Sequence, residues 1–126
     1  MVMDLQDDRS FGALVSFGVG GVATKLLGDR AYAVVPLTTA DASALITGPR
    51  AAPLLTGYDG EPPADTSALA DLALRVSALS DELPEVVELR LTGVAAPSGV
   101  SVLTAMARVA PSVPRADSGP RRLRGF

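Results

Sequence analysis

The sequence predicts an α+β domain in which helices pack on one face of a mainly antiparallel sheet. From Leu69 to Leu83, apolar residues recur at spacings of three and four, which is the period of an α-helix with one buried face. From Val87 to Thr92, apolar and polar residues alternate, which is the period of a strand with one buried face. A helix with one apolar stripe must cover another element, so these segments predict two packed layers.

The composition fits one domain with a core of aliphatic side chains. The chain has 126 residues, of which 48% are hydrophobic and 4% aromatic, and this excludes a disordered chain. Cysteine and histidine are both absent, which excludes disulfides, thiolate or imidazole metal sites, and Ser-His-Asp or Cys-His catalysis. No apolar run approaches the ~20 residues that cross a bilayer. We therefore expect a cytoplasmic protein with no membrane segment.

Charge is distributed unevenly along the chain. The formal net charge is −3, which divides into −6 for residues 1–110 and +3 for residues 111–126. An acidic body argues against nucleic-acid binding. The last residues combine prolines and arginines without periodicity, so we expect a domain over 1–110 and a basic, disordered tail over 111–126.

The first half of the chain predicts two strands and a short helix. Residues 12–17 form an apolar run that ends in the glycine turn 18–21, and residues 31–35 form a second run that ends at a proline. Residues 38–41 match a capping box, with Asp41 three residues after Thr38. The helix that it opens would contain the apolar residues Ala42, Leu45 and Ile46 and stop at Gly48-Pro49. Residues 50–65 predict a loop with a helical turn.

The second half predicts a long helix and a closing hairpin. Asp65, Thr66 or Ser67 can cap the helix, and Pro84 ends it. A turn at residues 97–99 returns the chain as a partner strand over residues 100–109, and the helix is expected to lie on this hairpin. The predicted order is β-β-α-loop-α-β-β.

The glycine turn is the first candidate for chemistry. Gly18, Gly20 and Gly21 do not have the spacing of the dinucleotide or phosphate-loop fingerprints. Their backbone N–H groups could approach an anion, or the glycines could serve only a tight turn with positive φ. Lys25, the only lysine, could bind phosphate after this turn or could simply be exposed.

Carboxylates are the second candidate, because Mg²⁺ takes one or two of them together with phosphate oxygens. Glu85 and Glu88 precede or begin a predicted strand, and Asp7-Asp8 lie near the start of the chain. Arg90 follows Glu88 on the same polar face, and a cation repels a divalent metal. We therefore expect a solvated face with a Glu88/Arg90 pair, and the residues alone show no complete catalytic set.

The order of motifs resembles one family. Residues 6–12 and 15–22 are similar to the "QDP-x-FG … FG-x-GG" stretch of the ATP-grasp domain in ADP-forming acyl-CoA synthetases, the acetate–CoA ligase type that is often fused to an acetyltransferase domain. Residues 53–58 resemble "PLL-x-G", and residues 84–89 resemble "PE-(I/V)-x-EL". The resemblance runs from about Gln6 to Pro111 and implies the carboxyl-terminal ATP-grasp subdomain, whose family uses ATP and Mg²⁺.

Polar positions of the family pattern are replaced in this chain. Where the family has Asp and Asn after "EL", the sequence has Arg90 and Thr92, and Thr104 replaces a further Asp. Lys25 replaces a glutamate, and Ala33 replaces an arginine. If the resemblance holds, these replacements remove the metal and phosphate contacts of the family, so metal-dependent ATP use should fail.

Three hypotheses follow. The first is a degenerate, non-catalytic subdomain that binds a ligand, regulates, or contacts a subunit; the second is a nucleotide-binding piece of an active acetate–CoA ligase completed by another chain. The third, compatible with the first, is a structural protein that self-associates through exposed sheet edges.

Partners would be a CoA-ligase or acetyltransferase chain, or a second copy. We expect no catalytic residue, no metal ligand and no firmly required cofactor; the candidate nucleotide-binding residues are Gly18, Gly20, Gly21, Lys25, Glu88 and Arg90.

Overall fold

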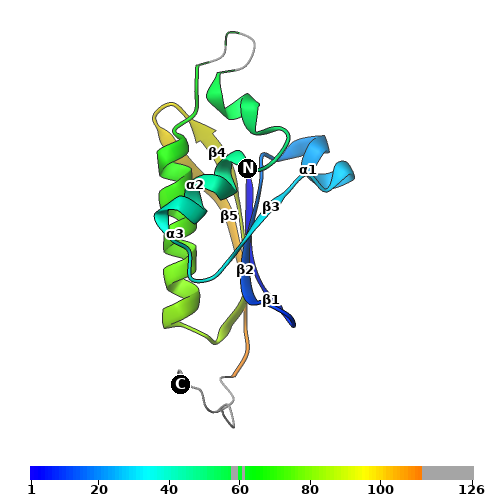
Figure 1. Cartoon of the computed structure of the whole chain (residues 1–126), viewed down its shortest axis with the longest axis vertical. Coiled ribbons are helices and arrows are strands. Elements are labelled where there is room, and N and C mark those ends of the chain that lie inside the picture. The colour runs from blue at the N-terminus through cyan, green and yellow to red at the C-terminus, as the bar shows by residue number, and fades with distance from the viewer. Residues whose placement is uncertain (58–59, 61, 112–126) are drawn as a thin grey trace.

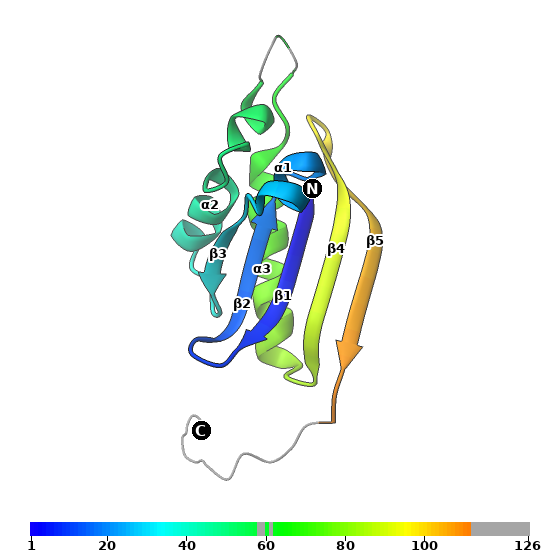
Figure 2. The same cartoon turned by 90° about the vertical axis from the view of Figure 1, so that its right-hand side faces the viewer.

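The computed structural model describes residues 1–57, 60 and 62–111. It consists of a sheet with most of its helices on one face, while a short helix over residues 21–27 lies on the opposite side, near one end of the sheet (Figure 1). Five antiparallel strands form one sheet in the order β3-β2-β1-β4-β5 (Figure 2). The strands are β1 (Val2–Asp8), β2 (Gly12–Gly18), β3 (Ala31–Val34), β4 (Val86–Ala96) and β5 (Gly99–Val109). The helices are α1 (Gly21–Leu27), α2 (Thr39–Thr47), the 3₁₀ helix η1 (Ala52–Thr56) and α3 (Thr66–Glu82). The α+β prediction is confirmed.

Strand β1 is absent from the predicted element order, and the structure places it at the centre of the sheet. It pairs with β2 on one side and with β4 on the other. Its pattern does alternate, since Met3 and Leu5 are buried in the core. However, Asp4 lies between them and is also almost fully buried. The alternation runs only from Met3 to Gln6, and a pattern of four residues is too short to predict the strand with certainty.

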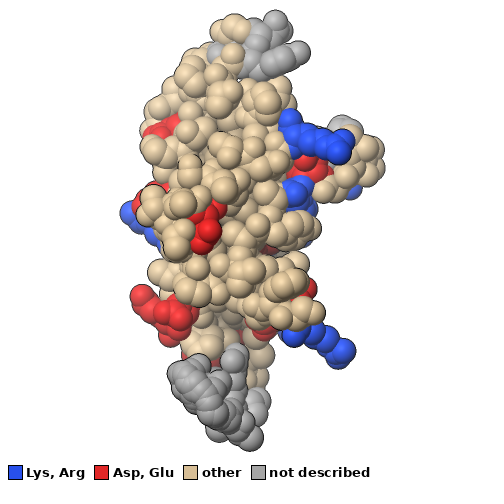
Figure 3. Space-filling view, in the orientation of Figure 1, with Lys and Arg blue, Asp and Glu red and all other residues tan. Residues whose placement is uncertain are grey.

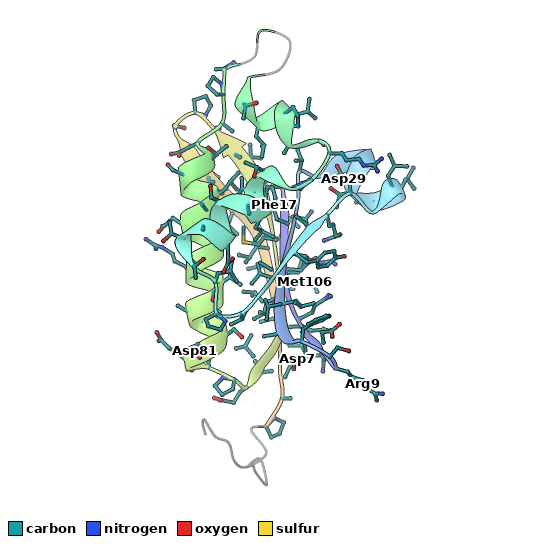
Figure 4. All side chains as sticks on the ribbon, viewed as in Figure 1. Asp7, Arg9, Phe17, Asp29, Asp81 and Met106 are labelled. Atoms are coloured by element: carbon teal, nitrogen blue, oxygen red, sulfur yellow. The ribbon has the colours of Figure 1, made fainter. Side chains whose placement is uncertain are left out.

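The core lies between the sheet and the layer of α2 and α3. Phe17 of β2 is fully buried there, together with Leu45, Ile46 and Leu69 from the helices; Figure 4 shows Phe17 between the two layers. Helix α3 packs against α2 and lies across β1, β2, β4 and β5. The prediction that α3 lies on the closing hairpin is confirmed by its contacts with β4 and β5. The helix also covers β1 and β2, because the unpredicted β1 joins the other strands to the hairpin.

The helix termini follow the sequence closely. The Thr38 hydroxyl accepts a hydrogen bond from the Asp41 amide at 3.1 Å, and the Asp41 carboxylate accepts one from the Thr38 amide at 2.9 Å, which completes the predicted capping box. These bonds lower the pKa of Asp41. Of the three predicted caps for α3, Asp65 is the one observed. At the other end of the apolar stripe, Leu83 is 45% exposed, because α3 ends before it.

Three further expectations concern the tail, membrane-spanning segments and the loop over residues 50–65. The predicted basic tail falls almost wholly within residues 112–126, which lie outside the described residues. In the part of the chain that is described, no helix is long and apolar enough to cross a membrane. The loop over residues 50–65 contains the helical turn that the sequence predicts, as η1.

Candidate functional site

The face of the sheet opposite α2 and α3 carries two of the candidate residues, Glu88 and Arg90. Side chains alternate between the two faces of a strand, so the burial of Met3 and Leu5 in the core turns Asp4 and Gln6 to this uncovered face. The register places Arg90 of β4 beside Asp4, and Met106 of β5 beside Arg90. Figure 3 shows Lys and Arg side chains protruding on the side of the molecule where Figure 1 shows the uncovered face.

Asp4 is the central charge of this face and holds two arginines. Its Oδ2 accepts a hydrogen bond from Nη1 of Arg30 at 2.7 Å, and its Oδ1 accepts one from Nε of Arg90 at 2.8 Å. A longer bond of 3.3 Å joins Nη2 of Arg90 to Oδ2. The Asp4 side chain is only 9% exposed, whereas that of Arg90 is 57% exposed. The hydrogen bond and charge of Asp4 raise the pKa of Arg90, so Arg90 is a fixed, permanently charged group.

Glu88 pairs with Arg108 on the neighbouring strand β5. Nε of Arg108 donates to Oε1 of Glu88 at 3.0 Å. This hydrogen bond and the charge of Arg108 lower the pKa of Glu88, with a smaller contribution from Arg90. The predicted Glu88/Arg90 pair is therefore wrong in detail: each residue bonds to a different strand, because neighbouring strands bring oppositely charged side chains closer than two positions along one strand.

These pairs surround a shallow hollow of about 510 Å³ on the uncovered face. Gln6, Glu88, Arg90, Met106 and Arg108 contribute to its lining together with Asp4, Leu5, Leu89 and Ala107. A second hollow of about 520 Å³ continues across the face towards β3, where Phe11, Leu14 and Tyr32 contribute. Gln6 lines both. The face is thus charged over β4 and β5 and aromatic towards β3.

The glycine turn lies at the end of β2 and does not line either hollow. Gly20 has φ +109, and its N–H donates to the buried Thr24 hydroxyl at 2.9 Å. Gly18 lies so close to Thr24 that a Cβ at this position would sit 2.7 Å from the Thr24 Oγ1. These contacts support the tight-turn interpretation. Gly21 begins α1, and Lys25 lies exposed on that helix.

The donor set at the hollow does not fit a divalent cation. Mg²⁺ needs carboxylate oxygens with free lone pairs directed at one point. Both Asp4 oxygens accept hydrogen bonds from guanidinium groups, and Glu88 accepts one from Arg108. Among the described residues, no group of three acidic side chains is placed to hold a metal ion. The hollow can instead offer guanidinium N–H groups to an anion.

Sequence reasoning found Glu88 and Arg90 but missed Asp4, Arg30 and Gln6. The available signal was weak: Asp4 and Gln6 alternate with Met3 and Leu5, which indicates a strand with a polar face. Nothing local links Asp4 to Arg90, which is 86 positions away. Of the six predicted nucleotide-binding residues, the structure brings Glu88 and Arg90 to one hollow and places Gly18, Gly20, Gly21 and Lys25 apart from it.

The fold and the polar sheet face define the class of protein. Residues 1–109 match the family model of an ATP-grasp domain. The chain is 39% identical over 94 residues to an acetate–CoA ligase (ADP-forming) I of Archaeoglobus fulgidus. This alignment covers 75% of this chain and 14% of the relative. It is 36% identical over 88 residues to acetate–CoA ligase (ADP-forming) II subunit beta of Pyrococcus furiosus. Here the alignment covers 70% of this chain and 37% of the relative.

Solved structures show the same relation. A dinucleotide-forming acetyl-coenzyme A synthetase 1 of Ca. Korarchaeum cryptofilum, in complex with coenzyme A and Mg-AMPPCP, is 35% identical and superposes with a TM-score of 0.81 over 86% of this chain and 51% of that one. A Pyrococcus horikoshii protein superposes with a TM-score of 0.80 at 30% identity, over 88% of this chain and 48% of that one.

The chain therefore belongs to the ATP-grasp family. It corresponds to part of the ATP-grasp region of ADP-forming acyl-CoA ligases. This confirms the resemblance found in the sequence. The chain spans about one third of the length of the Pyrococcus beta subunit and about half of the solved structures that it matches. The activity of the whole relatives is therefore not carried over to it directly.

Proposed function

We propose that this chain is a non-catalytic ATP-grasp subdomain that acts by binding other molecules, as a regulatory or subunit-interaction module in the cytoplasm. The observation that carries the proposal is the state of Arg90. The family pattern has an aspartate at this position. This chain has an arginine there, and its guanidinium is fixed by two hydrogen bonds to Asp4. The group that should hold a cation is itself a cation.

The neighbouring carboxylates support the same conclusion. Asp4 and Glu88 are the acidic side chains that line the hollow with Arg90, and both are already bound by arginines. A cation such as Mg²⁺ would have to displace these ion pairs while it remained next to three guanidinium groups. Metal-bridged phosphate binding needs the opposite arrangement.

Calorimetric titration with ATP, in Mg²⁺ and then in a chelator, tests this proposal. We expect no metal-dependent binding to the wild-type chain. Any weak binding of metal-free ATP should use Arg90, so that Arg90→Gln abolishes it and Arg9→Gln, an exposed substitution in the β1–β2 turn, preserves it. Micromolar binding that requires Mg²⁺ would refute the proposal.

The alternative is a nucleotide-binding piece of an active ligase that another chain completes. One observation favours it: relatives from Pyrococcus furiosus are named as subunit beta, so ligases of this family exist as more than one chain. In that case Lys25 and Arg90 would neutralise phosphate directly, and Gly18, Gly20 and Gly21 would approach it by their backbone.

A reconstitution assay separates the two functions. The chain is mixed with a chain that carries the remaining parts of an ADP-forming acetate–CoA ligase, and acetyl-CoA formation is measured from acetate, CoA and ATP. The non-catalytic proposal predicts no product above that of the second chain alone. Product that depends on both chains, and that Lys25→Ala or Arg90→Gln removes, would establish the alternative. A CoA-ligase or acetyltransferase chain remains the proposed partner class, beside a second copy of this chain.

A further inference from the structure

The two edges of the sheet differ in length and in protection. One edge is β3, which has four residues and packs against α2. The other is β5, which has eleven residues and, in Figure 2, no described element on its outer side. Every residue from Ser101 to Val109 is exposed. A long strand at an open edge presents unpaired N–H and C=O groups to any chain that can pair with it.

Strand β5 also lacks the residues that usually prevent such pairing. It contains no proline and no lysine, and its single charged residue is Arg108, which is held by Glu88. Large apolar side chains are exposed along it instead: Leu103 at 68%, Met106 at 70% and Val109 at 66%. Edge strands that remain unpaired in solution are commonly charged, short or interrupted by proline. This edge therefore has the chemistry of a covered strand.

The sequence of β5 matches itself in one antiparallel register. Thr92 pairs with Thr104 and Gly93 with Val102, so Leu103 is an extra residue at a bulge and the regular strand follows it. A twofold axis at Met106 would pair Leu103 with Val109, Thr104 with Arg108, and Ala105 with Ala107 of a second copy. No like charges then face each other, and the two most exposed apolar side chains of the strand, Met106 and Leu103, gain apolar neighbours.

We propose that β5 pairs antiparallel with β5 of a second copy of this chain, centred on Met106, so that the two copies share one ten-stranded sheet. The inference rests on the proposed interaction role, and it names a second copy as one partner. The pairing is isologous and therefore closes at a dimer. Met106 and Arg108 line the hollow of about 510 Å³, so the pairing places this hollow of one copy beside the same hollow of the other copy. It also brings Thr104 of one copy to Arg108 of the other.

Sedimentation velocity on the full chain, over a wide range of concentration, tests the pairing. The wild type should form a dimer and no larger species. Met106→Lys should raise the dimer dissociation constant about tenfold or more, because two ammonium groups would face each other at the axis. Leu26→Lys, at a side chain that is 77% exposed on α1, is the matched control and should leave the constant unchanged.

A cysteine substitution tests the register independently. The chain has no cysteine, so Met106→Cys would place one thiol opposite its counterpart across the paired strands, where a disulfide can form. We expect oxidation to cross-link Met106→Cys efficiently and Ser101→Cys, on the other side of the bulge, poorly. A wild-type monomer at all concentrations, a dimer that Met106→Lys leaves intact, preferential cross-linking at position 101, or open-ended oligomers would each overturn the inference. The nucleotide titration above is independent of these outcomes.

Discussion

Asp4 places a carboxylate in the middle of a sheet, where only its two arginine partners compensate its burial. Burying a charge is costly unless the charge is paired and hydrogen-bonded, and removing one member leaves the others uncompensated. Both oxygens of Asp4 are used, one by Arg30 and one mainly by Arg90. Arg30 is 19% exposed in its side chain, so it depends on Asp4 more than the exposed Arg90 does.

We predict that Asp4→Asn lowers the free energy of unfolding by about 2 kcal/mol, which is less than for a fully buried pair because water reaches Arg90. Urea denaturation measures it. Asp71→Asn is the matched control, since Asp71 also pairs with an arginine but on the exposed surface of α3, and its effect should stay below about 0.5 kcal/mol. Equal effects of the two substitutions would show that Asp4 is not a structural charge.

The pKa of Glu88 gives a second prediction at the scale of single residues. Arg108 lowers this pKa below the ordinary value of 4.5 by a hydrogen bond and by its charge. The pair thus favours the folded state above pH 4.5, and this contribution disappears as the pH falls through the lowered pKa. Arg108→Gln should return the pKa towards 4.5, as measured by carboxyl NMR titration. An unchanged pKa would mean that the pair does not form in solution.

The candidate site was only partly predictable at this scale. The spacing of Glu88, Arg90 and Thr92 was enough to predict a polar strand face, and the facing positions Thr104 and Met106 could be expected from the hairpin; the register confirms them. The partners of the arginines could not be predicted. Asp4 reaches Arg90 only because β1 inserts between β2 and β4, and no local pattern encodes an insertion of that kind.

Among the elements, the β2–α1 turn shows how a backbone contact constrains sequence. Gly18 approaches Thr24, and the Thr24 hydroxyl in turn accepts the Gly20 N–H. We predict that Gly18→Ala costs about 1–3 kcal/mol in the free energy of unfolding, because its Cβ would overlap the Thr24 side chain. In a Thr24→Ala background the same substitution should cost clearly less, and denaturation of the wild type, the two single variants and the double variant measures this coupling. Strictly additive effects would contradict the contact.

Elements with a strong local signal were predicted well. Helix α2 follows from its capping box, α3 from its 3–4 spacing and its cap, and the β4–β5 hairpin from alternation and its turn. Strand β1 and helix α1 were not predicted. Helix α1 has seven residues, which is too short for a clear period. Strand β1 alternates only from Met3 to Gln6 before two further acidic residues, which is also a short pattern.

At the scale of the whole molecule, the layer of α2 and α3 covers one face of the sheet. In the described part of the chain, the β5 edge and most of the other face stay open, apart from the short helix α1 near one end (Figure 2). An isolated domain usually covers such surfaces or makes them strongly polar. Here the open face combines ion pairs, aromatic side chains and two hollows. The chain spans only part of the length of its ATP-grasp relatives, and these open surfaces are where we propose that it contacts other molecules.

We propose that the open face has lost its capacity to hold a divalent cation, and a Mn²⁺ titration monitored by amide NMR can detect any such binding residue by residue. Paramagnetic Mn²⁺ broadens the signals of residues near its binding site. We expect the amides of Asp4, Glu88 and Arg90 to broaden no more than that of Ala42 in the helix layer, with or without ATP. Saturable broadening confined to Glu88 and Arg90 would mean that the open face binds a divalent cation after all.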